Sequence, residues 1–513
     1  MNAWTAFAQA ARPDTPAVTE LNQWLQDWAG RLDFRLMDAR RCLPPHLVLA
    51  LGNRGVLGMQ VAEAQGGLLG FSTFELLRVQ RQLGAIDLTL AFFVGLNNGL
   101  GIRPIQRFGS AAAKARYLPQ LATGRMLAAF ALTEQGAGSN PLNLAATARR
   151  EGDHWRLDGR KSWCGSAAWA GVISVFARHL DEQGRECGFI GFCLDADQPG
   201  LRQGSEALTL GLKGMVQNQV HFDAVEVAAE QVLGSQFAGM AVASDTMVFG
   251  RLGIAATCIG ALWRCVQLMT RYSTRRSLGT HRLWDHEHTQ AQIGGAICAA
   301  TALGGWVDDL ATGLDQGQPA PPAEVLAAVK WLASELLGEV SDSALQMLGA
   351  RGYCDNNPIG QLWRDARITR LFEGPSQTLA AFIGQRVLEQ PAVIKAYLAF
   401  MPHGQLAIQR LDAWLSSERL QPRDNDRLSE QVLQLGQCVA WLMLSAQALE
   451  EHCRPWVASR LEKAARDWEH LASPRFALAG LGEWVDARIG VFDRQRADEE
   501  VALDELLVCG DDA

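Results

Sequence analysis

The hydrophobic residues of this chain change their spacing twice, and this change constrains its fold more than any other feature. From Val18 to Ala122 the apolar side chains recur at helical spacing, which buries one face of a helix. From about Phe130 to Leu233 they form short runs rich in Val, Ile, Phe and Trp that alternate with polar residues, as strands with one buried face require. Beyond Phe237 the helical spacing returns and continues into the tail. The predicted order is helices, then a sheet, then helices.

Chain length divides this order into domains, because 513 residues exceed one ordinary hydrophobic core. We predict an α+β protein with a helical domain at 1–125, a β-domain at 126–236, a second helical domain at 237–390 and an additional helical domain at 391–513. Within the β-domain, Asp158-Gly159 and the residues near Gly184 are predicted to form turns.

Composition excludes several classes of protein. A net charge of −8 with a pI near 5.8 gives no basic surface for nucleic acid. The eleven cysteines include no C-x-x-C pair, which favours reduced thiols over a disulfide framework or a zinc finger. The first ten residues lack the pattern of a secretory signal, and no run of about 18 apolar residues indicates a membrane span. We therefore expect a cytoplasmic protein.

The segment 281–288 contains an H-x-H pair, a spacing that also occurs in metal sites. A connecting loop is favoured, because the pair lacks a fixed third ligand, and no metal is predicted.

A glycine-rich segment, Thr133-Glu134-Gln135-Gly136-Ala137-Gly138-Ser139, follows the apolar run 126–132. Its hydroxyl group and small residues let backbone N–H groups approach an anion, which suits a phosphate-bearing cofactor. The same letters also fit an ordinary turn, so this segment alone does not decide.

Several separated motifs agree, and here the sequence resembles the acyl-CoA dehydrogenase family. The resemblance begins with Met126 to Glu134, the Gly-Ala-Gly-Ser turn, an Asp-Gly-Arg-Lys hairpin and Trp163. The other matching segments, in the family's order, are Val61 to Leu68, Tyr117 to Pro119, Arg275 to Gly279, Gln346 to Tyr353, Trp363 to Arg367 and Leu371 to Gln377. Trp363 to Arg367 and Leu371 to Gln377 count as one motif, and such agreement at six separated places is improbable by chance.

The resemblance implies a fold, a cofactor and partners. The fold is an N-terminal helical domain, a β-barrel-like middle domain and a C-terminal helical bundle, with FAD between the sheet and the bundle. The implied substrate is an acyl thioester, carried by coenzyme A or by acyl-carrier protein, and the implied electron acceptor is an electron-transfer flavoprotein. The ADP half of FAD would reach a neighbouring subunit, which implies a homo-oligomer, with a dimer favoured.

The same resemblance implies roles for individual residues. Phe130, Leu132 and Thr133 would border the flavin ring, Trp163 would cover it, and Arg275 and Gln346 would hold the ADP half from the neighbour. The cofactor-binding set is Phe130, Leu132, Thr133, Gly138, Ser139, Trp163, Gly165, Arg275, Leu278, Gln346, Gly349, Ala350, Pro375 and Gln377. The substrate-binding set is Ser139, Arg251, Phe372 and Gly374.

Removing a weakly acidic proton beside a thioester carbonyl needs a positioned carboxylate with a raised pKa. Glu373 matches the family's base, and its own N–H with a flavin ribityl hydroxyl would bind the carbonyl oxygen. Some family members carry the base before the arginine that corresponds to Arg251. Gly250 occupies that place here and cannot abstract a proton, so Glu373 is predicted to be the base.

Four residues depart from the family's pattern and make the flavin contacts less polar. Gly165 stands where a threonine hydroxyl usually bonds near flavin N5, although the amide of Gly165 or Ser166 could still donate. The other departures are Leu278 for phenylalanine, Pro375 for threonine and Met215 for serine or threonine. Because the sequence does not separate the thioester carriers, we keep open an acyl-carrier-protein-dependent dehydrogenase or an acyl oxidase on the same fold. A catalytically silent flavin-binding scaffold is the third alternative, which the lost flavin contacts favour and the retention of Glu373 argues against.

The tail 391–513 carries 13 basic and 20 acidic residues. We predict that it packs on the dehydrogenase body, caps a surface otherwise used for tetramers, and does not bind anionic lipid, since that needs clustered Lys and Arg. Its tryptophans at 414, 441, 456, 468 and 484 are expected to pack in the core.

Overall fold

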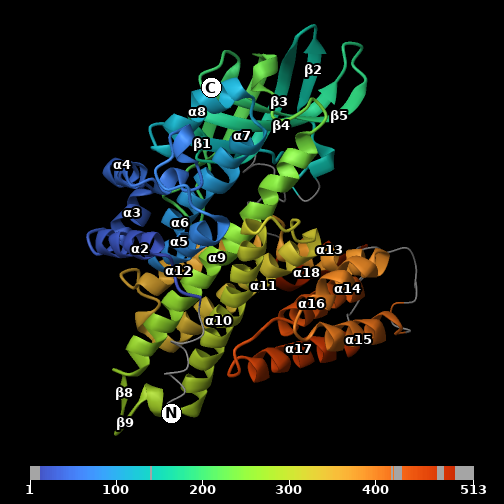
Figure 1. The fold of residues 1–513 in the computed structure, drawn as a ribbon. Coiled ribbons are helices and arrows are strands. Elements are labelled where there is room, and N and C mark those ends of the chain that lie inside the picture. The colour runs from blue at the N-terminus through green and yellow to red at the C-terminus, as the bar shows by residue number, and fades with distance from the viewer. Residues whose placement is uncertain (1–11, 139–140, 418–419, 421–429, 471–478, 491–513) are drawn as a thin grey trace.

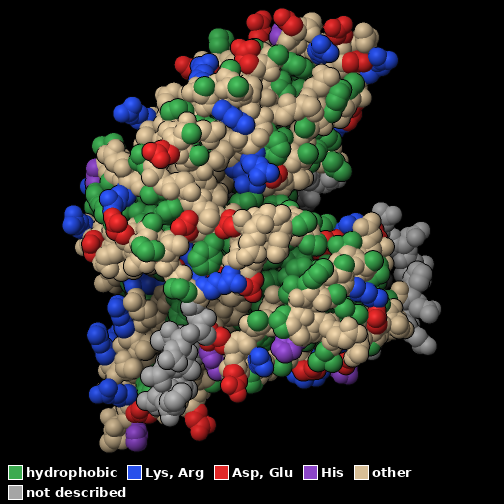
Figure 2. All heavy atoms as spheres, viewed as in Figure 1, with side chains coloured by type: hydrophobic (Ala, Val, Ile, Leu, Met, Phe, Trp, Pro, Cys, Tyr) green, Lys and Arg blue, Asp and Glu red, His purple; other side chains and the backbone are tan. Residues whose placement is uncertain are grey.

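The computed structural model describes residues 12–138, 141–417, 420, 430–470 and 479–490. A lobe that contains the sheet lies above a larger body of helices, and helix α9 (Gly239–Ser273) links them (Figure 1). This helix starts beside the sheet, crosses the body and ends at the small ribbon β8–β9 on the opposite side (Figure 1). Figure 2 shows that the surface is hollowed between the sheet lobe and the C-terminal helices.

The first part of the chain is helical, as its apolar spacing predicts. Its elements are α2 (Pro16–Ala29), α3 (Phe34–Arg40), α4 (Pro45–Asn53), α5 (Thr73–Ile86), α6 (Leu88–Gly95), the π-helix η3 (Leu96–Ile102), α7 (Arg103–Phe108) and α8 (Ala111–Ala122). A capping box between Ser72 and Glu75 starts α5, because each side chain bonds the other residue's backbone N–H. Helix α6 is apolar on every side and buried, so it belongs to the core that η3 continues.

The middle of the chain forms one seven-stranded sheet. Its strands are β1 (Ala128–Ala131), β2 (Thr147–Glu151), β3 (His154–Gly165), β4 (Val172–Leu180), β5 (Glu186–Asp195), β6 (Leu201–Glu206) and β7 (Gln217–Val227). The order is β1-β4-β2-β3-β7-β6, and β5 pairs with β4. Strand β4 is parallel to β1 and β2, and the remaining pairs are antiparallel. Trp155 and Leu157 are buried and Arg156 is exposed, so the alternation expected for a strand is confirmed.

The predicted turn at Asp158-Gly159 is wrong, because this pair lies inside β3. The hairpin turn between β2 and β3 lies at Gly152-Asp153 instead. Gly159 sits where the register with β7 shifts, at φ 138°, and a methyl group there would lie 2.6 Å from the Cβ of Ala146. A glycine in a strand marks a bulge or a close approach as well as a turn, and the letters alone do not separate these.

After the sheet the chain returns to long helices. They are α9, α10 (Glu287–Asp315), α11 (Ala323–Leu348), α12 (Pro358–Ala366) and α13 (Ser376–Glu389), with the short 3₁₀ helix η9 (Arg367–Arg370) between the last two. Helix α9 packs against α5, α10 and α11, so it forms the centre of the helical body.

Helix α9 corrects the expectation that no segment is apolar enough to span a membrane. By length and composition it could cross a bilayer, with a mean hydropathy of 1.5 in its most apolar window. Inside the protein, however, 67% of that window is buried by the surrounding helices. Packing in the core therefore accounts for its apolar character.

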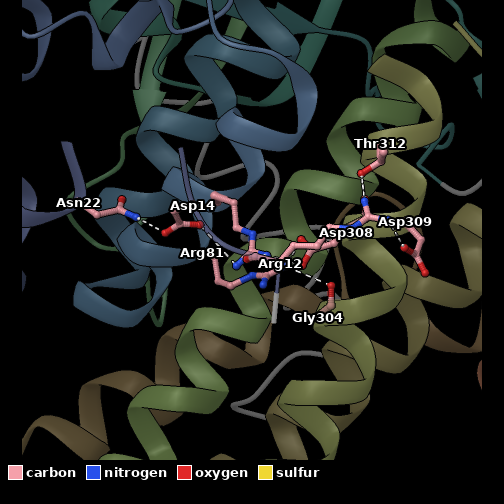
Figure 3. Close-up of polar contacts among 9 residues, drawn as sticks. Arg12, Asp14, Asn22, Arg81, Gly304, Asp308, Asp309 and Thr312 are labelled. Carbon is pink, nitrogen blue, oxygen red and sulfur yellow. Dashed lines mark hydrogen bonds and ion pairs between the residues drawn. The ribbon is translucent and has the colours of Figure 1, made fainter. Parts of the chain in front are cut away.

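An ion-pair cluster fastens the N-terminal helices to α10, as Figure 3 shows for Arg12, Arg81, Asp308 and Asp309. Asp308 accepts hydrogen bonds from Arg78 at 2.8 Å and from Arg81 at 2.9 Å. Arg12 donates to Asp309 at 3.1 Å. These contacts hold α5 on the helical body, and α6 and η3 follow α5 directly in the chain.

The tail continues the helical body. Its described helices are α14 (Pro391–Ala399), α15 (Gly404–Leu415), α16 (Glu430–Ser445), α17 (Arg454–Glu469) and α18 (Leu481–Ile489). Helix α16 lies so close to α13 that a methyl group at Gly436 would be 1.8 Å from the carbonyl oxygen of Ala380. The expected burial is found for Trp414, Trp441 and Trp468, whereas Trp456 is partly buried and Trp484 is 51% exposed. The prediction that the tail tryptophans pack in the core is therefore wrong for Trp484.

The segment 281–288 forms a turn and a helix start. Strand β9 (His281–Arg282) pairs with β8 (Ser277–Leu278), and α10 begins at Glu287. Within the described part of the chain, no three His, Cys, Asp or Glu side chains come together as metal ligands.

Candidate active site

Glu373 lies in the short loop, residues 371–375, between η9 and α13. Its backbone φ is 52° and that of Gly374 is 102°, so a glutamate occupies the left-handed region that favours glycine. A methyl group at Gly250 on α9 would lie 3.8 Å from Oε1 of Glu373. The Glu373 carboxylate therefore faces the place where a side chain at position 250 would begin.

Burial raises the pKa of the Glu373 carboxyl group, and the positive charges of Arg251 and Lys330 oppose that rise. Burial also lowers the pKa of the Arg251 guanidinium, which the Glu373 charge counteracts. The buried Nε of Arg251 has no hydrogen-bond partner among the residues that the structure describes. The Glu373 carboxylate is thus poised to accept a proton, and the Arg251 N–H that lacks a partner can bind a polar group of the molecule that gives up the proton.

Residues of α6 and η3 form an apolar wall of this site. Phe92 lies edge-on to Phe372, with 5.0 Å between ring centroids, and Cδ2 of Leu100 would lie 3.3 Å from a methyl group at Gly250. Leu96 stands midway between Phe92 and Leu100 in the chain, and the regular four-residue spacing repeats along one helical face. This wall was missed by sequence reasoning, although the spacing could have suggested it. The π-helix that aims these side chains leaves no recognisable sequence signal.

The predicted flavin-covering residue, Trp163, lies near the end of β3 with φ 58° and a 55% exposed side chain. Ser166 also has a positive φ, 59°, and its buried Oγ has no hydrogen-bond partner among the described residues. A strained, exposed indole and an unsatisfied buried hydroxyl close by fit a planar, hydrogen-bonding group such as a flavin. The residues present therefore fit FAD.

Gly165 has no room for the threonine side chain usual in the family. An added Cβ would lie 2.4 Å from Cδ1 of Leu96 and 3.1 Å from Nε2 of Gln217. Leu96 can therefore occupy this position only because residue 165 has no side chain.

The glycine-rich turn lies beside Trp163. The carbonyl oxygen of Thr133 accepts a hydrogen bond from the N–H of Ser162 at 2.9 Å. Phe130 and Leu132 are half-buried at the end of β1, and the ring centroid of Phe130 lies 5.0 Å from that of Phe176. Gly138 is exposed, with open space where a side chain would begin. Ser139 lies outside the described residues. The structure therefore brings Thr133, which follows Phe130 and Leu132 at the end of β1, next to Ser162 and Trp163 near the end of β3.

Glu134 anchors this turn through a buried ion pair. Its Oε1 accepts a hydrogen bond from Nζ of Lys161 at 2.6 Å, and the N–H of Ala146 donates to the same oxygen at 3.1 Å. Lys161 also donates to the carbonyl oxygen of Leu132 at 3.1 Å. Glu134 and Lys161 therefore hold the start of the turn against β3 and the chain around Ala146.

The remaining predicted residues lie in two places. Pro375 directly precedes α13, and Gln377 is exposed in the first turn of that helix. The other five residues are exposed just beyond the end of α9 or at the end of α11: Arg275, Leu278, Gln346, Gly349 and Ala350. From Arg251 to the end of α9 at Ser273 the helix runs roughly 33 Å, at about 1.5 Å per residue. Arg275 and Leu278 therefore lie far from the Glu373 site of their own chain.

Comparison with known proteins now identifies the family. Sequence profiles of the acyl-CoA dehydrogenase N-terminal, middle and C-terminal domains match residues 29–125, 129–225 and 238–388. The chain belongs to the acyl-CoA dehydrogenase family. It is an oxidoreductase acting on CH–CH bonds, with the family's FAD as cofactor, and its fold is the family's.

Relatives cover the body of this acyl-CoA dehydrogenase. It is 29% identical over 340 residues to the short/branched chain specific acyl-CoA dehydrogenase of Bos taurus, covering 66% of this chain and 78% of the relative. Identity to the Homo sapiens short-chain specific enzyme is 28% over 390 residues, covering 75% of this chain and 92% of that one.

Solved structures extend the comparison. Butyryl-CoA dehydrogenase from Megasphaera elsdenii, 25% identical, has a TM-score of 0.69 and covers 74% of this chain and 100% of its own. An acyl-CoA dehydrogenase complexed with FAD from Bacillus anthracis, 21% identical, has a TM-score of 0.70 and covers 88% of this chain and 84% of its own. The match to the Bacillus anthracis structure covers more of this chain than residues 1–390, so the shared fold extends into the tail 391–513.

Proposed function

We propose that this acyl-CoA dehydrogenase converts an acyl-CoA to the trans-2-enoyl-CoA, with Glu373 as the base that removes the α-proton. The observation that carries the proposal is the position of the half-buried Glu373 carboxylate, which faces Gly250 and is close enough to Arg251 for that charge to oppose the rise in its pKa. Family members that place the base before the arginine need a carboxylate at position 250, and here that space adjoins the Glu373 carboxylate instead.

The environment of Glu373 suits a base for a weak carbon acid. Burial raises the pKa of the carboxyl group, so the carboxylate holds the abstracted proton more strongly than it would in water. A positioned base of this kind contributes roughly 10² to 10⁴ in rate. The N–H of Glu373 is proposed to donate to the thioester oxygen where negative charge develops. FAD, when bound, supplies the acceptor for the hydride that leaves the β-carbon.

The acyl part of the substrate is proposed to be apolar. Phe92, Leu100 and Phe372 surround the space beside Glu373 with hydrocarbon side chains. An apolar chain buried against them contributes about 0.8 kcal/mol per CH₂ group, whereas a charged acyl group there would lose its hydration without a partner.

A homo-oligomer, with a dimer favoured, is proposed as the working form, and electron-transfer flavoprotein as the acceptor. Arg275 and Leu278 are exposed far from the Glu373 site of their own chain, which supports a role for them in a neighbouring subunit. A cytoplasmic location is proposed on the composition alone.

One observation favours a second candidate, an acyl oxidase on the same fold. Gly165 lacks the side-chain hydroxyl that the family usually has near flavin N5, and Cδ1 of Leu96 occupies the space where that side chain would begin. Loss of a donor beside flavin N5 changes how the reduced flavin reacts, and oxygen is one acceptor it could then use.

The test is anaerobic reduction of the purified yellow protein with a panel of acyl-CoAs and acyl-carrier proteins. Bleaching of the flavin by an acyl-CoA, with enoyl-CoA as the product and slow reoxidation in air, is the expected result. Fast reoxidation with release of hydrogen peroxide supports the oxidase instead. A protein that binds FAD and is bleached by no thioester in the panel contradicts both functions and supports a silent scaffold.

A further inference from the structure

A lysine is completely buried behind the Glu373 loop. Lys330 lies in the first half of α11, its side chain has 0% exposure, and its Nζ donates to the carbonyl oxygen of Gly374 at 2.8 Å. An ammonium group loses several kcal/mol of hydration when it is buried, so it is retained only where its surroundings use the charge. The residue that accepts its hydrogen bond is the one directly after the proposed base.

The charged and titratable groups around Lys330 come from three elements. Glu373 approaches from the loop, Arg251 and Cys258 from α9, and Glu335 from α11 itself. Burial lowers the pKa of Lys330 to about 8, against the opposing effect of Cys258, Glu373 and Glu335. The Lys330 charge in turn lowers the pKa of Glu373, in the same direction as Arg251. The two side chains are thus electrostatically linked across the loop.

The loop also needs a mechanical hold. A non-glycine residue in the left-handed region costs of order 1–2 kcal/mol and persists only where its neighbours fix it. Helix α11 fixes this loop on both sides of Glu373. Arg370 donates to the carbonyl oxygen of Glu335 at 2.9 Å, Ser376 donates to the Glu335 carboxylate, and Lys330 holds Gly374 between them. The strained backbone of Glu373 is therefore held by contacts from α11 to Gly374 and to the two ends of the loop.

We propose that Lys330 is a positioning residue for the Glu373 base: its ammonium group holds the Gly374 carbonyl and keeps Glu373 ionised in a buried site. This inference rests on the proposed function, since it assumes that Glu373 accepts the substrate's α-proton. Lys330 itself touches neither substrate nor the reacting atoms. It acts through the geometry and the charge state of Glu373.

Two substitutions separate the hold from the charge. Lys330→Met removes the hydrogen bond and the charge, whereas Lys330→Gln keeps a donor near Gly374 and removes only the charge. The matched control is Glu324→Gln, which removes another buried charge of α11 at its ion pair with Arg386, 2.8 Å away. Glu324 has no contact with the loop among the described residues, so it reports the general effect of losing a buried charge.

The measurement is the rate of anaerobic flavin reduction by the best acyl-CoA as a function of pH. Lys330→Met is expected to reduce the rate by about 10²-fold, the effect of a small misplacement of a reacting group. Its acid limb should move to higher pH, because Glu373 loses a stabilising positive charge. Lys330→Gln should recover part of the rate and keep the displaced acid limb. Glu324→Gln should leave the acid limb where wild type has it.

An acid limb of Lys330→Gln that coincides with wild type overturns the electrostatic part. A Lys330→Met rate equal to wild type overturns the positioning part. If Lys330→Met does not fold, Lys330→Gln still decides through its pH profile.

A readout without turnover separates this inference from the proposed function. Infrared difference spectroscopy can follow the protonation of Glu373 through a carboxyl band identified by its absence from Glu373→Gln. The midpoint of that titration should lie at higher pH in Lys330→Gln than in wild type. If no acyl thioester reduces the wild type but the midpoint still moves, the proposed function fails while the link between Lys330 and Glu373 stands. An unmoved midpoint overturns the link, whatever the enzyme's activity.

Discussion

Replacing Lys161 by methionine should destabilise the part of the sheet where the glycine-rich turn meets β3, beside the proposed cofactor site. The side chains of Lys161 and Glu134 are 0% and 4% exposed, and their charged atoms are 2.6 Å apart. Without the lysine, Glu134 stays buried with backbone N–H partners such as Ala146 but without a positive charge. Removing one partner of a buried pair typically costs about 3–5 kcal/mol. We therefore expect Lys161→Met to lower the free energy of unfolding by at least about 3 kcal/mol.

Urea unfolding of the FAD-loaded protein, followed by the fluorescence of the bound flavin, measures this loss. Lys395→Met is the control, since its ion pair with Asp412 is solvent-exposed and contributes at most about 1 kcal/mol. The double variant Lys161→Met/Glu134→Gln should be more stable than Lys161→Met, because no uncompensated charge remains. A Lys161→Met protein within about 1 kcal/mol of wild type would refute the reasoning that the pair anchors the turn.

Three further predictions address other parts of the chain. Gly165→Thr should lower the free energy of unfolding by about 1–3 kcal/mol, because the new side chain clashes with Leu96. The double variant Gly165→Thr/Leu96→Ala should bind FAD and change the reduction potential of the flavin. An unchanged potential would show that residue 165 does not contact the flavin. Burial and the Asp87 charge raise the pKa of Asp365 to about 7, so the folded state keeps a proton that the unfolded state loses, and the free energy of unfolding should fall as pH rises from about 4 to 7. Asp365→Asn should make this slope shallower in urea titrations, with the remainder due to groups such as Asp87, whose pKa burial raises to about 6. A slope equal to that of wild type would contradict the prediction. Sedimentation should give a dimer whose full chain does not pellet with anionic vesicles; a stable tetramer or firm pelleting would contradict the role proposed for 391–513.

Much of the architecture could be predicted because periodicity records which face of each element is buried. The helices α9, α10, α11 and α13 all lie where the apolar spacing indicates. The π-helical turn η3 could not be predicted, since it depends on how the chain packs and not on a local pattern. The turn predicted at Asp158-Gly159 was wrong because a glycine with positive φ occurs both in turns and in β-bulges, and the sequence does not distinguish the two.

The candidate site divides in the same way. Motif residues such as Glu373 and Trp163 could be located because the resemblance fixes their order, but their partners could not. Lys330 is the clearest omission: it stands within an uninterrupted apolar stretch, between Val329 and Trp331, where a lysine must be buried. That signal was present in the sequence, and only the structure shows that the charge lies under the Glu373 loop.

The central claim is that Glu373 removes the α-proton, and Glu373→Gln tests it most directly. The amide has nearly the shape of the carboxylate, so folding, the yellow colour of bound FAD and the affinity for an enoyl-CoA product should persist. Proton removal should fail, and anaerobic stopped-flow reduction by the best acyl-CoA should slow by at least about 10²-fold, the smallest effect usual for a lost general base. A variant reduced at close to the wild-type rate would contradict the account.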